Sequence, residues 1–495
     1  MTESNAALLE LAASDLRMLI GGERVEAASG ERFEVLNPAT GETIATVPAA
    51  NAADVDAAVA AARAALPGWR AMAPAARAEL MWNLGTRIAE LSEELATLEA
   101  LDNGKTRGDA LMVDIPLASE IFRYYAGWAT KIEGVAIPTA GGLAQHVYTV
   151  REPVGVVAAI VPWNFPLLMC AYKAGPSLAA GNTLVIKPAE QTPLSALRLA
   201  DLVEEVGFPP GVVNVVTGDG PSAGAPLSAH LGVDKVTFTG ETGTGQKILE
   251  ASKANLKRVS LELGGKSPSL VFADADLDAA VEGTYGAVYF NQGQCCIAGA
   301  RVFVHEDVHD AFVEKLLAKL KTVQLGSGLD ADTDMGPLVS AEQAERVTGF
   351  ISAGRDEGAT ELAGGGPAEL AGEHANGYFV RPALFTDVEP EMRVMREEIF
   401  GPVGMVSRFR EEDEAIAAAN DTVFGLASGL WTRDVKRAHR VAAQIQAGTV
   451  WINTYGFFDV AVPYGGFRMS GYGKELGAEA LDPYLQTKSV WTDLS

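Results

Sequence analysis

Short apolar runs alternate with helix-length segments between residues 154 and 265, and this alternation restricts the possible fold more than any other feature. The runs are rich in valine and isoleucine and nearly continuous in apolar character, as strands buried on both faces must be. They occupy residues 155–161, 183–187, 212–216, 235–239 and 258–263. The repeated succession of strand and helix predicts a parallel sheet covered by helices, with its ligand crevice at the carboxyl ends of the strands.

The flanking regions extend this α/β pattern. Residues 52–133 carry helical periodicity and few strand signals, so we expect helices that pack against the sheet. After Lys266 a second α/β series begins, which predicts a second domain with the strands SLVFAD, RVFVHE, VGMVSRF and GTVWIN. One helix start is well marked, because Thr192 can act as the cap and Pro193 can occupy the first helical position.

Two further segments, HVYTVREPV (146–154) and the tail KSVWTDLS (488–495), have the character of edge strands. Apolar strands at the margins of a large chain often pair with another subunit, since an unpaired edge otherwise invites uncontrolled association. We favour an intersubunit role for both segments. The alternative is that each strand caps its own sheet.

Charge and cysteine content exclude several classes of protein. The 495 residues include 39 Lys and Arg against 64 Asp and Glu, a net charge of −25, which opposes nucleic acid or an anionic membrane as the main partner. Three cysteines without a CxxC pair form no disulfide framework, so a reducing, cytoplasmic location is expected. The acidic N-terminus argues against a signal peptide, and no apolar run is long enough to span a membrane. None of the six histidines lies in one of the glycine-rich motifs described below, so we assign no metal.

A thiol and a carboxylate are candidates for covalent chemistry. Cys295 and Cys296 are adjacent in the loop FNQGQCCIAG, where no histidine is present to activate a thiol, so activation must come from the loop backbone or a helix N-terminus. A cysteine taken alone is more often an inert buried residue. Glu262 lies inside the apolar run VSLEL, so it has either a hydrogen-bond partner or the raised pKa of a general base. Gly264 and Gly265 would let a ligand approach the backbone closely.

Three loops at the ends of the predicted strands have the composition of ligand-binding turns. In PWNFP, Asn164 lies between two prolines, and its amide can donate to a developing oxyanion or simply form the turn. In KPAE, Glu190 stands where an acidic residue accepts hydrogen bonds from the ribose of NAD, unless it is merely solvated. The junction FTGETGTGQKI suits a pyrophosphate although it does not match GxGxxG. Glu241 would repel that pyrophosphate, so we expect its side chain to point away.

Seven motifs occur in one order along the chain: PWNFP, KPAE, the turn from Gly240 to Gly245, LELGGKSP, FNQGQCC, EEIFGPV and PYGGFRMSGYGKELG. In order and spacing they resemble the NAD(P)-dependent aldehyde dehydrogenase superfamily, from about residue 19 to the C-terminus. The resemblance implies an α/β fold with a Rossmann-like parallel-sheet cofactor domain, a second α/β domain that carries the thiol, and a small discontinuous β element for oligomerisation. The corresponding ranges are 1–135 with 154–265 for the NAD-binding domain, 266–479 for the catalytic domain, and 136–153 with 480–495 for the oligomerisation strands of a homodimer or homotetramer.

The resemblance also implies the reaction, the oxidation of an aldehyde to its carboxylic acid with NAD. Cys296 would form a thiohemiacetal and then a thioester, Asn164 would stabilise the oxyanion, Glu262 would activate water, and Lys173 would relay protons. The implied cofactor-binding residues are Pro162, Trp163, Lys187, Glu190, Gly220, Phe238, Gly240, Glu241, Gly245, Leu263, Glu398 and Phe400. Glu241 departs from the serine that many members have there. The implied substrate funnel consists of Phe165, Met169, Tyr172, Phe457, Phe458 and Tyr464.

An aromatic funnel favours aromatic or medium-chain aldehydes, because rings offer a large buried area and stacking. A betaine or amino aldehyde is an alternative substrate, since an aromatic cage can hold a cation. Acylation of coenzyme A is a rival reaction, and Glu262 argues against it because that route needs no base for water. A non-catalytic protein that kept the fold is a further alternative, opposed by the joint presence of Cys296, Glu262, Asn164, Lys187 and Glu398.

Overall fold

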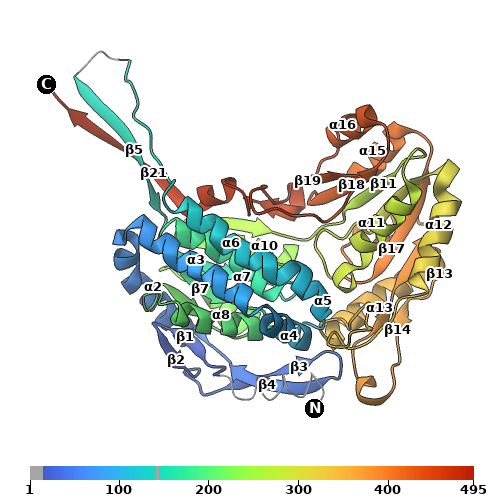
Figure 1. Cartoon of the computed structure of the whole chain (residues 1–495), viewed down its shortest axis with the longest axis horizontal. Helices are drawn as coiled ribbons and strands as arrows, with labels where there is room; N and C mark the ends of the chain where they lie inside the picture. The colour runs from blue at the N-terminus through green and yellow to red at the C-terminus, as the bar shows by residue number, and fades with distance from the viewer. Residues whose placement is uncertain (1–14, 141–143) are drawn as a thin grey trace.

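The computed structural model describes residues 15–140 and 144–495. Two large sheets, each covered by helices, form two lobes, and a two-stranded ribbon projects from the first lobe (Figure 1). Residues 1–14, which carry most of the sequence argument against a signal peptide, lie outside this range. Among the described helices, none has the length and hydropathy that a bilayer span requires.

The first sheet contains the five strands predicted from the apolar runs, and it confirms their parallel arrangement. These central strands are β6 (Val156–Ile160), β7 (Thr183–Lys187), β8 (Val213–Val215), β9 (Lys235–Thr239) and β10 (Arg258–Glu262). The sheet order is β2-β1-β8-β7-β6-β9-β10-β20. Its antiparallel edges are β1 (Met18–Ile20) and β2 (Glu23–Val25) on one side and β20 (Gly471–Tyr472) on the other. The second half of the chain therefore returns a strand to the first sheet.

Alternate residues of the central strands enter two different cores, which explains why the runs are continuously apolar. In β6, Val157 and Ala159 pack with helices α7 and α8, whereas Val156 and Ala158 pack on the opposite face with α2. The helices of this lobe are α2 (Ala52–Ala71), α3 (Pro74–Glu90), α4 (Ser92–Asp102), α5 (Arg107–Asp109), α6 (Ile115–Trp128), α7 (Pro166–Ala179), α8 (Leu194–Glu205), α9 (Ala225–Ala229) and α10 (Thr242–Ser252). The helical prediction for residues 52–133 is thus confirmed.

The predicted start of α8 needs a correction. The helix begins at Leu194, and Pro193 takes the cap position instead of the first helical position. Its first amide is not capped by Thr192. The Leu194 N–H donates instead to Asp102 Oδ2 (3.0 Å), a carboxylate from the end of α4 that is only 1% exposed. The Thr192 hydroxyl donates to the Trp163 carbonyl (3.4 Å), because tertiary packing brings better partners to both groups than the local sequence offers.

The second sheet has the order β13-β16-β17-β12-β11-β18-β19. Its strands are β11 (Pro268–Val271), β12 (Arg301–His305), β13 (Thr360–Ala363), β16 (Ala383–Thr386), β17 (Val403–Phe409), β18 (Ala427–Trp431) and β19 (Thr449–Ile452). All four predicted strands are present. The sequence analysis missed β13, β16 and β18. The segment of β18, ASGLW, lacks β-branched residues. Close packing requires a glycine at position 429 in β18, because an added Cβ at Gly429 would lie 2.5 Å from the Tyr455 ring.

Helices and small hairpins complete the two lobes. The helices of the second lobe are α11 (Leu277–Tyr289), α12 (Glu306–Leu320), α13 (Ala341–Asp356), α14 (Arg393–Arg396), α15 (Glu412–Asn420) and α16 (Val435–Ala442). The hairpins are β3 (Arg32–Asn37) with β4 (Glu42–Pro48) and β14 (Gly366–Pro367) with β15 (Val380–Arg381).

The two predicted edge strands pair with each other. β5 (Gln145–Pro153) and β21 (Leu485–Asp493) form an antiparallel ribbon over nine residue pairs, from Leu485–Pro153 to Asp493–Gln145. Figure 1 shows this ribbon, teal and red, extending away from both lobes. The alternative in which each strand caps its own sheet is therefore wrong. The strand also begins only at Leu485, because Glu479–Tyr484 form a 3-10 turn that buries Leu481 and Tyr484 in the first lobe.

Candidate active site

The thiol loop is held in an unusual backbone conformation beside the loop that follows β6. Asn291, Gln292 and Gly293 all have positive φ values, of +50°, +57° and +68°. Gly293 is required there, since an added Cβ would lie 2.2 Å from the Gly401 carbonyl oxygen. The Asn291 amide donates to the Asn164 backbone carbonyl (2.9 Å), which ties the two loops together. Backbone of this kind persists only where its surroundings enforce it, as they do at functional sites.

Cys296 lies half-buried at the end of this loop. Its Sγ is 3.3 Å from the Tyr464 hydroxyl oxygen. The next residue is fixed by Tyr455, whose hydroxyl donates to the Ile297 carbonyl (2.6 Å). The neighbouring Cys295 and burial together raise the pKa of the Cys296 thiol well above its usual value, and the Tyr464 hydroxyl acts in the opposite direction.

Asn164, predicted as an oxyanion donor, is buried next to the thiol loop. Its side-chain amide donates to the Gln294 carbonyl (2.9 Å), two residues before Cys296. A primary amide has two N–H groups, so one bond fixes the orientation of the group and leaves the other for a ligand. The structure therefore brings Asn164 and the thiol loop together as the sequence analysis expected.

Glu262 ends strand β10 and is only 3% exposed. Neither of its carboxylate oxygens has a hydrogen-bond partner among the described residues. Burial raises the pKa of Glu262 well above its usual value, and the nearby Glu475 raises it further. The sequence offered two alternatives for Glu262, a hydrogen-bond partner or a raised pKa. The structure supports the raised pKa. Gly465 leaves room for the Glu262 carboxylate, because an added Cβ at Gly465 would lie 2.6 Å from Glu262 Oε1.

Lys173, from α7, lies behind this carboxylate. Its ammonium group forms a buried ion pair with Glu475 and donates to the Thr239 hydroxyl (2.6 Å). The sequence analysis missed Glu475 as a site residue. The available signal was an acidic residue within the motif PYGGFRMSGYGKELG, although the motif alone does not reveal that the residue is buried.

The expected cofactor residues of the first lobe follow the carboxyl ends of its parallel strands. Lys187 at the end of β7 pairs with Glu190 at a distance of 3.1 Å (Nζ to Oε2). The others lie after β6 (Pro162, Trp163), after β8 (Gly220), in β9 (Phe238), between β9 and α10 (Gly240, Glu241), in α10 (Gly245) and after β10 (Leu263). Glu241 precedes α10, is exposed, and makes no side-chain cap of that helix. Its orientation relative to a pyrophosphate stays a prediction.

The second lobe contributes Glu398 and Phe400. The Gly265 N–H donates to Glu398 Oε1 (2.9 Å), and burial raises the pKa of Glu398 to about 7. The Phe400 ring meets the Trp163 ring edge-on with 5.2 Å between their centroids, which joins the two lobes. Gly264 and Gly265 allow other parts of the protein to pack closely against the backbone. An added Cβ at Gly264 would lie 2.1 Å from Glu398 Oε2, and one at Gly265 would lie 2.4 Å from the Cys296 carbonyl oxygen.

Several predicted funnel residues form aromatic contacts, and Tyr464 places one group of them beside the thiol. Tyr464 meets Phe458 and Tyr172 edge-on, with ring centroids 5.4 Å and 6.3 Å apart, respectively. Phe165 stacks on Phe290, with Met169 buried in the same core. Phe457 is 76% exposed, so unlike the other predicted funnel residues it does not belong to this packed group. The sequence analysis missed three rings of the cluster, namely Phe290, Trp451 and Tyr455.

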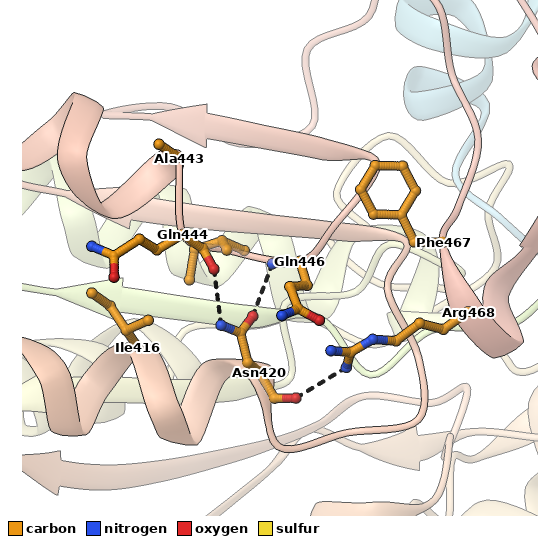
Figure 2. Close-up of a pocket in the computed structure, with 8 residues that line it drawn as sticks. Ile416, Asn420, Ala443, Gln444, Gln446, Phe467 and Arg468 are labelled. Atoms are coloured by element: carbon orange, nitrogen blue, oxygen red, sulfur yellow. Dashed lines mark hydrogen bonds between the residues drawn. The ribbon is translucent and has the colours of Figure 1, made fainter.

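An open pocket of about 720 Å³ lies in the second lobe and contains none of the predicted site residues. Its lining residues are Ile416, Asn420, Ala443, Gln444, Ile445, Gln446, Phe467 and Arg468. Figure 2 shows the Asn420 side chain bridging to the backbone of Gln444 and Gln446, and Arg468 donating to the Asn420 carbonyl. Asn420 and Arg468 are thus engaged in hydrogen bonds within the protein.

A family model described as the aldehyde dehydrogenase family matches residues 25–490. The chain belongs to the aldehyde dehydrogenase family. It is 51% identical to DhaS of Bacillus subtilis (strain 168) over 481 residues, which cover 97% of this chain and 96% of that protein. It is 47% identical to the mitochondrial benzaldehyde dehydrogenase of Antirrhinum majus, covering 97% of this chain and 89% of that protein. The NAD+ complex of an aldehyde dehydrogenase from Bacillus cereus superimposes with a TM-score of 0.96 at 48% identity, covering 100% of this chain and 99% of that one.

Five of the seven motifs contact one another around Cys296, Glu262 and Asn164, namely PWNFP, LELGGKSP, FNQGQCC, EEIFGPV and PYGGFRMSGYGKELG. The α/β fold inferred from the resemblance is confirmed by the two parallel-rich sheets and by the superposition on aldehyde dehydrogenase structures.

Proposed function

We propose that this aldehyde dehydrogenase oxidises an aldehyde to its carboxylic acid with NAD as the acceptor, through Cys296 and a water molecule activated by Glu262. The contacts of two consecutive residues support this proposal most directly. The consecutive residues Tyr464 and Gly465 contact both groups, with the Tyr464 hydroxyl 3.3 Å from Cys296 Sγ and the Gly465 backbone against Glu262 Oε1. A nucleophile and a buried carboxylate that has no hydrogen-bond partner among the described residues thus meet at one short segment, and they are the two groups that this reaction needs.

The donor set fits a dinucleotide. The Lys187 and Glu190 pair offers an ammonium group and a carboxylate for ribose hydroxyls at the end of a parallel strand, and Glu398 offers a second buried carboxylate. The NAD+ complex of the Bacillus cereus relative supports this choice of cofactor. When bound, NAD supplies the two-electron acceptor for the hydride that leaves the aldehyde carbon. Glu190 would disfavour a 2′-phosphate, so NAD is proposed over NADP.

Each residue of the site has a separate role in this reaction. Cys296 Sγ attacks the aldehyde carbon, and the carbonyl electron pair moves to oxygen, where the Asn164 amide and the Cys296 N–H stabilise it. Departure of the hydride leaves a thioester on Cys296. Glu262 takes a proton from water, the resulting hydroxide attacks the thioester carbon, and the C–S bond breaks to release the acid and the thiolate. Lys173 and Glu475 offer a buried path for the proton that Glu262 must shed.

The packed rings around the thiol support an aromatic or medium-chain aldehyde as the substrate. The benzaldehyde dehydrogenase relative at 47% identity supports the same class. We expect kcat/KM, measured by formation of reduced nicotinamide with NAD and without coenzyme A, to be higher for benzaldehyde or phenylacetaldehyde than for acetaldehyde. An equal or reversed order would contradict the aromatic assignment, and a preference for betaine aldehyde would favour the cationic alternative.

The same assay separates the hydrolytic reaction from acylation of coenzyme A. Turnover that requires coenzyme A would mean that Glu262 does not activate water. NAD binding without turnover of any aldehyde would favour a protein that has kept the fold and lost the reaction.

We further propose that the β5–β21 ribbon pairs with another subunit in a dimer or tetramer. The ribbon projects from the lobe (Figure 1). Residues 135–137 pair with part of the outer edge of β5, but the outer edge of β21 is unpaired within the described chain, and such an edge invites pairing. We expect the full chain to sediment as an oligomer and Ser489→Pro to shift toward the monomer, since Ser489 lies opposite Thr149, whose N–H points away from β21, and proline at 489 therefore removes a donor on the outer edge of β21. A monomeric full chain, or an oligomer indifferent to this change, would contradict the proposal.

A further inference from the structure

The Tyr464 side chain brings a hydroxyl group, and not only a ring, against the candidate nucleophile. Its Oη lies 3.3 Å from Cys296 Sγ, within hydrogen-bond distance for sulfur, and the residue is 8% exposed. The role that the funnel prediction gave to this residue requires only an apolar ring, which phenylalanine would supply equally well. The hydroxyl therefore needs an explanation of its own.

The surrounding contacts fix the direction in which this hydroxyl points. The ring is held edge-on between Tyr172 and Phe458. The backbone is held by two hydrogen bonds to Glu475, from the Tyr464 N–H to its carbonyl (2.6 Å) and from the Glu475 N–H to the Tyr464 carbonyl (2.7 Å). A side chain so constrained has lost its conformational freedom before any substrate binds, as a preorganised donor must.

The titratable groups that face the Cys296 thiol make its ionisation difficult. They are Cys295, Tyr172, Tyr455, Tyr464, Glu262 and Glu398. None of these groups is a cation, and a deprotonated carboxylate among them repels a thiolate. The nearby lysines act on other members of the set, Lys105 on Cys295 and Lys173 on Glu262. The Tyr455 hydroxyl proton is already engaged, because it donates to the Ile297 carbonyl. Tyr464 is thus the group in this set with a hydroxyl bonded to the sulfur itself.

The protonation state of the sulfur decides which atom donates. A neutral thiol can donate to the tyrosine or accept from it, but a thiolate has no proton and can only accept. Hydrogen bonds to an ionised group are roughly twice as strong as those between neutral groups. The contact therefore stabilises the thiolate more than the thiol. Burial raises the pKa of Tyr464 well above its usual value, so the phenol keeps the proton that it donates.

We propose that Tyr464 is a catalytic hydrogen-bond donor that stabilises the Cys296 thiolate and takes the place of the cationic partner that many cysteine nucleophiles have. This inference deepens the proposed function and rests on it, because it assumes that Cys296 acts as a thiolate nucleophile. It assigns to the hydroxyl group a part in activating the thiol, in addition to the contribution of the ring to the funnel.

Alkylation of Cys296 by iodoacetamide tests the donor without any aldehyde. The thiolate displaces iodide, so the rate against pH reports the thiol pKa, and fragmentation of the labelled peptide distinguishes Cys296 from Cys295. In Tyr464→Phe we expect the midpoint to lie about one pH unit higher, and alkylation below the midpoint to be about tenfold slower. With aldehyde and NAD, kcat/KM should fall about tenfold at pH 7 and recover as the pH is raised.

Tyr455→Phe is the matched control, since it removes a buried hydroxyl one residue from the thiol without removing a bond to sulfur. Its alkylation midpoint should equal that of the parent chain. An unchanged midpoint in Tyr464→Phe, or equal shifts in both variants, would overturn the proposal, because the hydroxyl would then act through packing alone. A shift confined to Tyr464→Phe in a chain without dehydrogenase turnover would instead leave the thiolate donor standing while the proposed function fails.

Discussion

Cys296→Ala should reduce aldehyde-dependent formation of reduced nicotinamide by roughly 10,000-fold or more, because it removes the atom that forms the covalent intermediate. The affinity for NAD should stay nearly unchanged. The proposed ribose ligands Lys187 and Glu190 follow a different strand, and their ion pair does not involve the thiol loop. Steady-state assays for turnover and fluorescence titration for NAD binding measure the two effects separately.

The two other cysteines provide the controls for this variant. Cys170 is fully buried in α7 and burial raises its pKa, so Cys170→Ala should keep its turnover apart from a loss of stability. Cys295→Ala should retain far more turnover than Cys296→Ala. If Cys295→Ala loses turnover and Cys296→Ala retains it, the nucleophile has been assigned to the wrong member of the pair. Loss of both turnover and NAD affinity in Cys296→Ala would mean that the thiol has a structural role.

Glu262→Gln should separate the two halves of the reaction. The variant keeps the shape of the side chain but cannot accept a proton from water, so thioester hydrolysis should slow roughly 100- to 10,000-fold. Attack by Cys296 and loss of the hydride do not require this base. We therefore expect a rapid burst of reduced nicotinamide, stoichiometric with the enzyme, followed by a very slow steady state in stopped-flow absorbance.

The acylated enzyme itself is observable. Mass spectrometry of the burst product should find the acyl group on the peptide that contains Cys296. Glu250→Gln, an exposed change in α10, should behave as the parent chain does. A Glu262→Gln variant with neither burst nor turnover would show that the carboxylate is needed before the thioester forms, and a variant with normal turnover would remove it from the mechanism.

The pH dependence of hydrolysis follows from the same residue. Glu262 can accept a proton only as the carboxylate, and burial raises its pKa well above the ordinary 4.5. The rate of thioester hydrolysis should therefore increase with pH through that raised pKa. It should be low in the mildly acidic range, where an exposed glutamate would already be ionised. In Glu262→Gln this rise should be absent from the steady state.

The sequence by itself determined the elements whose character is local. The five parallel strands of the first sheet are predicted because burial on both faces demands continuous apolar runs, and β6 to β10 follow that rule. The position of the thiol in a glycine-flanked loop and of Glu262 in an apolar strand was also readable, since each is a departure from the local pattern. The family resemblance depended on the order of such motifs along the chain.

Only the tertiary structure decided which side chains meet. Cys296 and Tyr464 are 168 residues apart in the sequence, and Lys173 and Glu475 are 302 apart, so no periodicity links them. The cap of α8 comes from Asp102, and β5 finds its partner in β21. Hydrophobic pattern specifies which face of an element is buried, because burial follows the side chains of that element. The partner of a buried polar group is specified only once packing has excluded water and every donor must find an acceptor within the protein.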